Sequence, residues 1–315
     1  MTEATLTGEK VSTTVSPAIE TSNLVKQYGR ITALDGLTMT VPRGEIFGFL
    51  GPNGAGKTTA VKLLLGLTRP TTGLANVLGH PAGDRATRGQ IGYLPELFRY
   101  QGWLTATEVL EYHCELSYMP RERRPTAIAD ALDTVGLTTR ARDRVETFSK
   151  GMQQRLGLGV ALLGKPDLVF LDEPTSALDP IGRHDVREII RGIKARGASV
   201  FLNSHLLSEV ELVCDRVAVV DHGQVLALGP IQEILGIANR VRLRVTGLPP
   251  NGIALLGRFG EVEDQAEWVV LRGIAEGAVP DIVAEVVRLG GRIYAVEPAQ
   301  QTLEDRFLQL LGGAT

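Results

Sequence analysis

This 315-residue sequence has few cysteines, few aromatic residues, only a small excess of acidic over basic residues and no long apolar run. Its two cysteines, Cys114 and Cys214, are too few for a disulfide framework and favour a reduced, cytosolic setting. With 33 basic and 36 acidic residues the net charge is −3, which argues against a protein that coats nucleic acid through bulk charge. We therefore expect no nucleic-acid partner.

The apolar residues that are present are enough for a folded core, since they make up 43% of the chain. The longest run of apolar residues and glycine, 156–164, is much shorter than the roughly 20 residues of a membrane-spanning helix. Residues 1–20 are rich in Thr and Ser and lack the apolar stretch of a signal peptide, so we expect a flexible tail there. The length predicts about two domains.

The pattern of apolar residues predicts an α/β fold. Alternating polar and apolar residues over 21–41 predict short antiparallel strands. An apolar run over 46–50, a glycine-rich turn and a helix-forming stretch over 60–67 match the strand, loop and helix that open a nucleotide-binding unit. Further apolar runs, typical of buried parallel strands, cover 168–171, 199–202 and 217–220.

Two other regions differ from this pattern. A helical subdomain is predicted over residues 97–155, approximately, with a capping box at Thr105 and Glu108. A second helix there opens near Pro125 and closes at Gly136. From residue 236 to 315 a small α+β domain is expected. Its strands are predicted over 241–245, 268–271 and 292–296, and its helices over 253–258, 282–288 and 303–311.

Residues 51–59 read GPNGAGKTT and match the phosphate-loop pattern G-x-x-x-x-G-K-[ST] at every required position. In such a loop the backbone N–H groups turn inward around phosphate oxygens, and the following helix offers its positive end. Lys57 is expected to reach the β- and γ-phosphates, and Thr58 to give its hydroxyl to Mg²⁺. A plain glycine-rich turn is the alternative, but the strand before the loop and the helix after it favour nucleotide binding. The expected nucleotide-binding residues of this loop are Gly51, Asn53, Gly54, Ala55, Gly56, Lys57, Thr58 and Thr59.

Two adjacent carboxylates, Asp172 and Glu173, follow the apolar run 168–171. The carboxyl end of a buried parallel strand lies at the sheet edge where α/β folds bind ligands. Asp172 is therefore expected to hold Mg²⁺, and Glu173 to orient or deprotonate the attacking water. A helix N-cap would be the usual interpretation of such a pair, but the phosphate loop upstream favours catalysis.

Residues 148–155 read FSKGMQQR, which resembles the signature motif L-S-G-G-Q of ATP-binding cassette (ABC) ATPases. Other marks of that family occur in the same order. Tyr28 stands where an aromatic residue stacks on adenine, residues 176–179 resemble the D-loop, and His205 resembles the switch histidine that acts with Glu173 and Lys57 in catalysis. The resemblance covers residues of about 21–235.

The resemblance implies a P-loop NTPase core with an antiparallel β subdomain and a helical subdomain, joined to a small C-terminal α+β domain that is regulatory or dimer-stabilising. It also implies that ATP and Mg²⁺ are bound between two cassettes packed head to tail, with Ser149 and Gly151 reaching the ATP of the partner chain. The second cassette is another copy of the chain or a paired cassette. Glu96 stands where the family most often has a glutamine that ligates Mg²⁺ and couples to the membrane partner. A glutamate oxygen also suits this cation, and Gln101 is the alternative coupling residue.

Six aromatic residues are concentrated between Tyr93 and Tyr118. Tyr112 and Tyr118 are expected to pack inside the helical subdomain. The resemblance implies that Phe98, Tyr100 and Trp103, next to Glu96, dock a cytoplasmic helix of a separate transmembrane permease.

The function implied is that of an ATP-hydrolysing subunit of an ABC transporter, in the manner of bacterial drug-resistance and sodium-export cassettes. It would export cargo from the cytoplasmic face of the membrane. The alternative is a soluble ABC-type ATPase that acts as a mechanical clamp on a ribosome or nucleic acid; tandem cassettes or long coiled coils are expected in that class. An ATP-gated module without hydrolysis is a third possibility.

Overall fold

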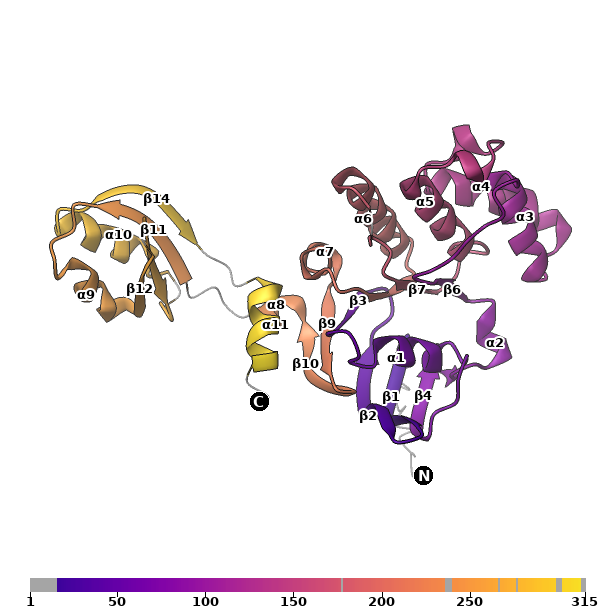
Figure 1. Ribbon diagram of the computed structural model, residues 1–315, viewed down its shortest axis with the longest axis horizontal. Coiled ribbons are helices and arrows are strands. Elements are labelled where there is room, and N and C mark those ends of the chain that lie inside the picture. Colours follow the sequence, from indigo (N-terminus) through magenta and orange to yellow (C-terminus); the bar gives the residue numbers. More distant parts are fainter. Residues whose placement is uncertain are drawn as a thin grey trace, which may run out of the picture.

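The computed structural model describes residues 16–176, 178–235, 240–265, 267–275, 277–298 and 302–312. Most of the expected N-terminal tail, residues 1–15, lies outside these ranges. Figure 1 shows three sheets with helices packed around them. In the part of the chain that is described, no helix has the length and apolarity needed to span a membrane.

An antiparallel sheet opens the chain, as the alternation over 21–41 predicts. Its strand order is β2-β1-β4-β5. Alternate residues of β2 are buried, which gives the strand one face against the core and one face in solvent. The strands are β1 (Ile19–Tyr28), β2 (Ile31–Val41), β4 (Thr72–Val77) and β5 (His80–Pro81).

The central sheet has six strands in the order β10-β9-β3-β8-β7-β6, and all its pairs are parallel except β10 with β9. Every residue of β3, β7 and β8 is buried, because successive side chains pack into two different cores on the two faces of the sheet. This arrangement confirms the predicted parallel strands. The strands are β3 (Ile46–Leu50), β6 (Ile91–Leu94), β7 (Leu168–Asp172), β8 (Ser199–Asn203), β9 (Arg216–Asp221) and β10 (Gln224–Pro230).

Helices cover the central sheet, and α3, α4 and α5 form a helical group on one side of it (Figure 1). The predicted capping box is confirmed: Glu108 N donates to Thr105 Oγ1 at 3.2 Å, and Thr105 N donates to Glu108 Oε2 at 2.7 Å. The helices are α1 (Lys57–Leu64), α2 (Arg85–Arg88), α3 (Ala106–Leu116), α4 (Arg124–Thr134), α5 (Lys150–Ala161), α6 (Pro180–Ala195), α7 (Leu207–Val213) and α8 (Ile231–Leu235).

The third sheet belongs to a small βαββαβ unit with its own hydrophobic core, and its order β12-β13-β11-β14 is that of ferredoxin-like folds. Alternate residues of the two central strands, Val241 and Leu243 of β11 and Val269 and Leu271 of β13, pack in one core with residues of α9 and α10. The elements are β11 (Arg240–Thr246), α9 (Gly252–Leu256), β12 (Glu261–Gln265), β13 (Trp268–Arg272), α10 (Val279–Arg288) and β14 (Arg292–Pro298).

The last described helix, α11 (Leu303–Gly312), does not share the core of the small unit. It packs against α7 and α8, and Leu303 is fully buried in the larger core (Figure 1). The carboxylate of Glu211 on α7 accepts a hydrogen bond from Leu303 N at 2.8 Å. The chain therefore returns to the larger unit after the small one.

Candidate active site

The phosphate loop joins β3 to α1 at the carboxyl edge of the central sheet. Gly56 has φ +99°, and a Cβ placed on it would lie 2.3 Å from Ala33 O. A Cβ on Gly51 would lie 2.3 Å from Val220 O. Side chains at these two positions would thus collide with backbone, which explains why the loop requires glycine there.

Lys57 is almost fully buried inside this loop and donates from Nζ to Gly51 O at 2.7 Å and to Pro52 O at 3.2 Å. Burial lowers its pKa, while the nearby carboxylates of Glu173, Asp172 and Glu96 act in the opposite direction. The fold thus places the ammonium group near the acidic residues that were predicted for the site.

Asp172 ends β7 and is buried, and its Oδ1 accepts a hydrogen bond of 2.5 Å from Asn203 Nδ2 on β8. Burial raises the pKa of Asp172; the Asn203 hydrogen bond opposes this, and repulsion from Glu96 and Glu173 adds to it. A buried carboxylate held among other carboxylates favours a cation in its vicinity. In nucleotide sites Mg²⁺ takes one or two carboxylates and completes its shell with phosphates and water.

Glu173 faces His205, with 2.8 Å between His205 Nδ1 and Glu173 Oε2. Its backbone N donates to Asn203 O at 2.8 Å, and its φ of +53° lies in the left-handed region that side-chain-bearing residues rarely adopt. Such strain persists only where surrounding structure enforces it, and it is concentrated at functional sites. The fold therefore brings together three predicted residues from three segments of the chain, namely Lys57 at the start of α1, Glu173 just after β7 and His205 between β8 and α7.

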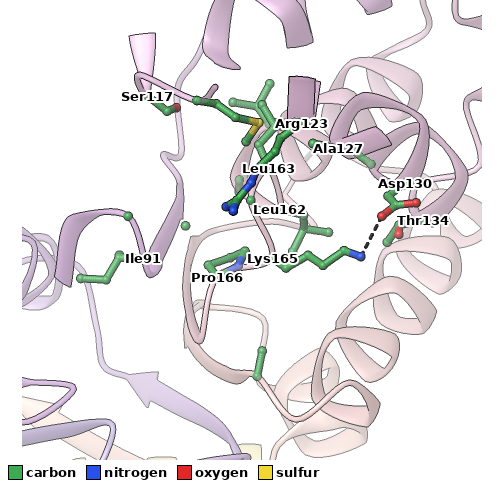
Figure 2. A pocket seen from close by; sticks show the side chains of 18 of the residues that line it. Ile91, Ser117, Arg123, Ala127, Asp130, Thr134, Leu162, Leu163, Lys165 and Pro166 are labelled. Carbon is green, nitrogen blue, oxygen red and sulfur yellow. Dashed lines mark ion pairs between the residues drawn. The ribbon is translucent and has the colours of Figure 1, made fainter. Parts of the chain in front are cut away.

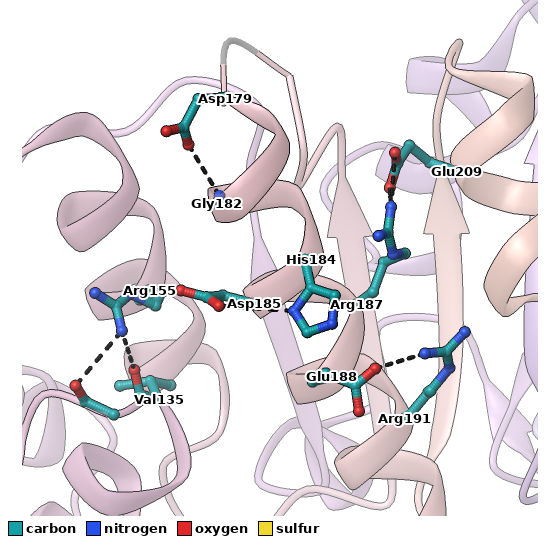
Figure 3. A network of polar contacts seen from close by, with 11 residues as sticks. Val135, Arg155, Asp179, Gly182, His184, Asp185, Arg187, Glu188, Arg191 and Glu209 are labelled. Atoms are coloured by element: carbon teal, nitrogen blue, oxygen red, sulfur yellow. Dashed lines mark hydrogen bonds and ion pairs between the residues drawn. The ribbon is translucent and has the colours of Figure 1, made fainter.

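Ser149 caps α5, because its Oγ accepts a hydrogen bond from Met152 N at 3.3 Å. Both Ser149 and Lys150 are exposed, and a Cβ on Gly151 would meet only Ser149 Oγ, at 4.0 Å. Arg155 holds α5 to the end of α4 through Val135 O at 3.4 Å and Gly136 O at 3.5 Å (Figure 3). The start of α5 is thus an open helix N-terminus.

The profile of the family described as "ABC transporter" matches residues 34–176. The chain is 38% identical to an uncharacterised ABC transporter ATP-binding protein of Nostoc sp., over 92% of this chain and 88% of the other. The chain belongs to the ABC transporter ATP-binding proteins. It is the ATP-binding and ATP-hydrolysing subunit of an ABC transporter, with Mg²⁺ as the partner ion of ATP.

Other ABC proteins are also similar over much of their length. The bacitracin transport ATP-binding protein of Bacillus licheniformis is 33% identical, over 96% of this chain and 99% of that one. The daunorubicin/doxorubicin resistance ATP-binding protein of Streptomyces peucetius is 40% identical, over 75% of this chain and 72% of that one. A solved ATP-binding subunit of an ABC transporter is 31% identical with a TM-score of 0.62, over 69% of this chain and 91% of that one. These likenesses confirm the predicted P-loop NTPase fold and favour the transporter subunit over the ribosome or nucleic-acid clamp.

Two further predicted residues of this ABC subunit are Tyr28 and Glu96. Tyr28 is 47% exposed at the end of β1, with Lys26 Nζ 4.8 Å from its ring centre. Glu96 is exposed just beyond β6, close enough to act on the charges of Lys57 and Asp172.

The aromatic residues near Glu96 fall into two groups. Phe98 and Tyr100 pack partly buried against the core, and burial raises the pKa of Tyr100, whereas Trp103 is 68% exposed. The expectation that Tyr112 and Tyr118 pack inside the helical subdomain was wrong, because they are 51% and 93% exposed. The buried face of α3 carries other residues, and Tyr118 follows the helix in a left-handed turn with φ +55°.

A cleft of about 1120 Å³ lies at the opposite edge of the sheet (Figure 2). Its walls include Ile91, which begins β6, and Pro166, which precedes β7, so it opens at the amino ends of the parallel strands. Lys165 Nζ lies 2.8 Å from Asp130 Oδ2 along its wall. Because phosphate loops stand at the carboxyl ends of such strands, this cleft is not the nucleotide site.

Sequence reasoning overlooked Asn203 as a partner of the site. It ends β8, the neighbour of β7, and its amide group holds Asp172. The carboxyl ends of adjacent parallel strands meet at one edge of a sheet. The polar residues 203–205, which directly follow the apolar run 199–202, could therefore have indicated that Asn203 lies beside Asp172.

Proposed function

We propose that this subunit powers export through a separate membrane permease, and that Glu173 is the general base for ATP hydrolysis. The observation that carries the proposal is the 2.8 Å contact between Glu173 Oε2 and His205 Nδ1, beside Asp172 and the buried Lys57. Glu173 would accept the proton of the attacking water, and His205 would orient Glu173 and interact with the developing phosphate charge.

The phosphate loop supplies the binding part of this site. Its backbone N–H groups and Lys57 would hold the phosphates, and Tyr28 would stack on the adenine ring. Thr58, Asp172 and Glu96 would hold Mg²⁺, which when bound would neutralise negative charge on the phosphates. The residues proposed for the phosphates are Gly51, Asn53, Gly54, Ala55, Gly56, Lys57, Thr58 and Thr59.

A second cassette would complete the site. The open N-terminus of α5, with Ser149 and Gly151, suits the γ-phosphate bound by the partner chain, because the positive end of a helix attracts anions. ATP would then bridge two cassettes and hydrolysis would release them. The partner cassette is a second copy of the chain or a paired cassette.

The permease would dock beside Glu96. Trp103 presents an exposed indole ring, while Phe98 and Tyr100 support the segment from within. Exposed aromatic side chains are frequent anchors of protein interfaces. This docking would hold the subunit at the cytoplasmic face of the membrane.

The chain's division into a cassette over 21–235 and a C-terminal part over 236–315 remains part of this proposal. The separate core of the βαββαβ unit supports a distinct domain, although Leu303 of α11, within 236–315, packs in the core of the cassette. We propose a regulatory or dimer-stabilising role for the small domain. The names of relatives linked to bacitracin transport and to daunorubicin resistance support the direction of export.

The proposal is tested by co-purifying the subunit from membranes with the permease encoded in an adjacent reading frame. Trp103→Ala is expected to lower the yield of the complex at least fivefold while the ATPase rate of the isolated subunit stays unchanged. Tyr118→Ala, which removes a more exposed aromatic ring from a neighbouring segment, serves as the control. Equal yields from Trp103→Ala and wild type would remove Trp103 from the docking surface.

A further inference from the structure

Helices α6 and α7 are joined by a ladder of polar contacts. Three basic residues of α6 recur at spacings of four and three residues, which places them on one helix face. Each of them contacts α7 or the residues just after it, and Figure 3 shows the first of these contacts, in which Arg187 reaches Glu209. Arg187 Nη1 lies 2.9 Å from both carboxylate oxygens of Glu209, Arg191 Nη2 lies 2.9 Å from Leu212 O, and Lys194 Nζ lies 2.6 Å from Asp215 Oδ1.

The first contact of the ladder is the most protected from water. The side chains of Arg187 and Glu209 are 18% and 10% exposed, compared with 39% and 33% for Lys194 and Asp215. A desolvated ion pair fixes geometry more strictly than an exposed one, because displacing either partner leaves an uncompensated charge. The Arg187–Glu209 pair is therefore the contact that sets how α7 sits on α6.

Both helices start next to segments that resemble ABC motifs. α6 starts after its N-cap Asp179, in the segment that resembles the D-loop, and α7 starts two residues after His205. Glu209 N donates to Leu206 O at 3.0 Å, and Leu206 N donates to Ser204 Oγ at 3.1 Å. Two short hydrogen bonds thus connect Glu209 to the residues on either side of His205.

The far side of α7 is also held. Glu211 accepts the hydrogen bond from Leu303 N at 2.8 Å, so α7 lies between α6 and α11. Since α7 has only seven residues, its position depends on these neighbours more than on its own helical stability.

We infer that Arg187 and Glu209 form a positioning pair for ATP hydrolysis, which holds α7 so that His205 Nδ1 stays in contact with Glu173 Oε2. The inference rests on the proposed catalytic role of Glu173 and His205. Arg187 and Glu209 contact α6 and α7 rather than the phosphate loop, so they act through His205.

The test measures kcat and KM for ATP in the full-length protein. Arg187→Ala is expected to lower kcat at least tenfold while KM changes less than twofold, because the phosphate loop is untouched. Arg187→Lys keeps the charge and is expected to recover most of the rate. Asp185→Ala is the matched control, because it removes an exposed ion pair with His184 on the same helix but outside the ladder, and it is expected to keep the wild-type rate.

A double-mutant cycle with His205→Ala separates positioning from a general structural role. If Arg187 acts through His205, Arg187→Ala in the His205→Ala background changes kcat less than twofold. Equal effects of Arg187→Ala in both backgrounds would overturn the inference, as would an unchanged kcat in the single variant. If Arg187→Ala does not fold, the same cycle is run with Glu209→Gln, which breaks the ion pair from the other side with little change in shape and must then show the same dependence on His205. An inactive wild-type protein would instead contradict the proposed function.

Discussion

The packing of α11 on the cassette can be tested by truncating Leu303. This side chain is fully buried in the larger core, while Leu308 on the same helix is 62% exposed. Leu303→Ala removes apolar groups worth about 0.8 kcal/mol per methylene, and the remaining cavity adds to the loss. The usual range for buried leucines, about 2.7–5 kcal/mol, predicts a loss near 3 kcal/mol. Leu308→Ala should change stability by less than about 0.5 kcal/mol.

Scanning calorimetry is the suitable assay, because the cassette and the small domain have separate cores and can unfold in separate transitions. Leu303→Ala should lower the Tm of the cassette transition by about 6–12 °C, at roughly 2–4 °C per kcal/mol, and leave the small-domain transition in place. Equal effects of Leu303→Ala and Leu308→Ala would refute the packing of α11. A shift confined to the small-domain transition would assign the helix to that domain instead.

The remaining predictions concern the nucleotide site. Gly56→Ala is expected to abolish ATP binding in calorimetry, because its Cβ would lie 2.3 Å from Ala33 O. The control Gly192→Ala, in open space on α6, should bind ATP normally. Normal binding by Gly56→Ala would show that the loop tolerates a side chain. Asp172→Asn should abolish Mg²⁺-dependent hydrolysis, because it removes the carboxylate proposed to hold the ion. The same variant should raise the stability of the nucleotide-free protein by about 0.5–2 kcal/mol, because burial raises the pKa of Asp172 and disfavours its ionised form in the fold. For the same reason the wild-type protein should lose Mg²⁺ activation on acidification at a higher pH than an ordinary aspartate would allow; a loss only near pH 4 would contradict this.

Much of the central fold could be predicted because its strands are buried on both faces. β7 and β8 therefore read as continuous apolar runs, and the phosphate loop after β3 has a fixed spacing. β10 and β12 were not predicted, since both lie at sheet edges and only one of their twelve residues is buried. Edge strands depend on pairing with a neighbour, which a single sequence segment does not reveal.

The contacts between distant segments were also beyond the sequence. Nothing in the local pattern of α11 indicates that Leu303 packs on the cassette after the small domain. The Arg187–Glu209 pair joins two helices whose charges look like ordinary solvated faces. Tyr118 is the opposite kind of error. As an aromatic residue it was expected in the core, but the left-handed turn after α3 places its side chain in solvent.

The role of Glu173 is the central claim, and Glu173→Gln tests it most directly. ATP affinity by calorimetry and steady-state ATPase rate are measured on the same preparation, with Glu188→Gln as an exposed control on α6. The account predicts that Glu173→Gln binds ATP with an affinity near that of the wild type and hydrolyses it at least about 100-fold more slowly, the usual contribution of a general base. A rate close to that of the wild type would contradict it.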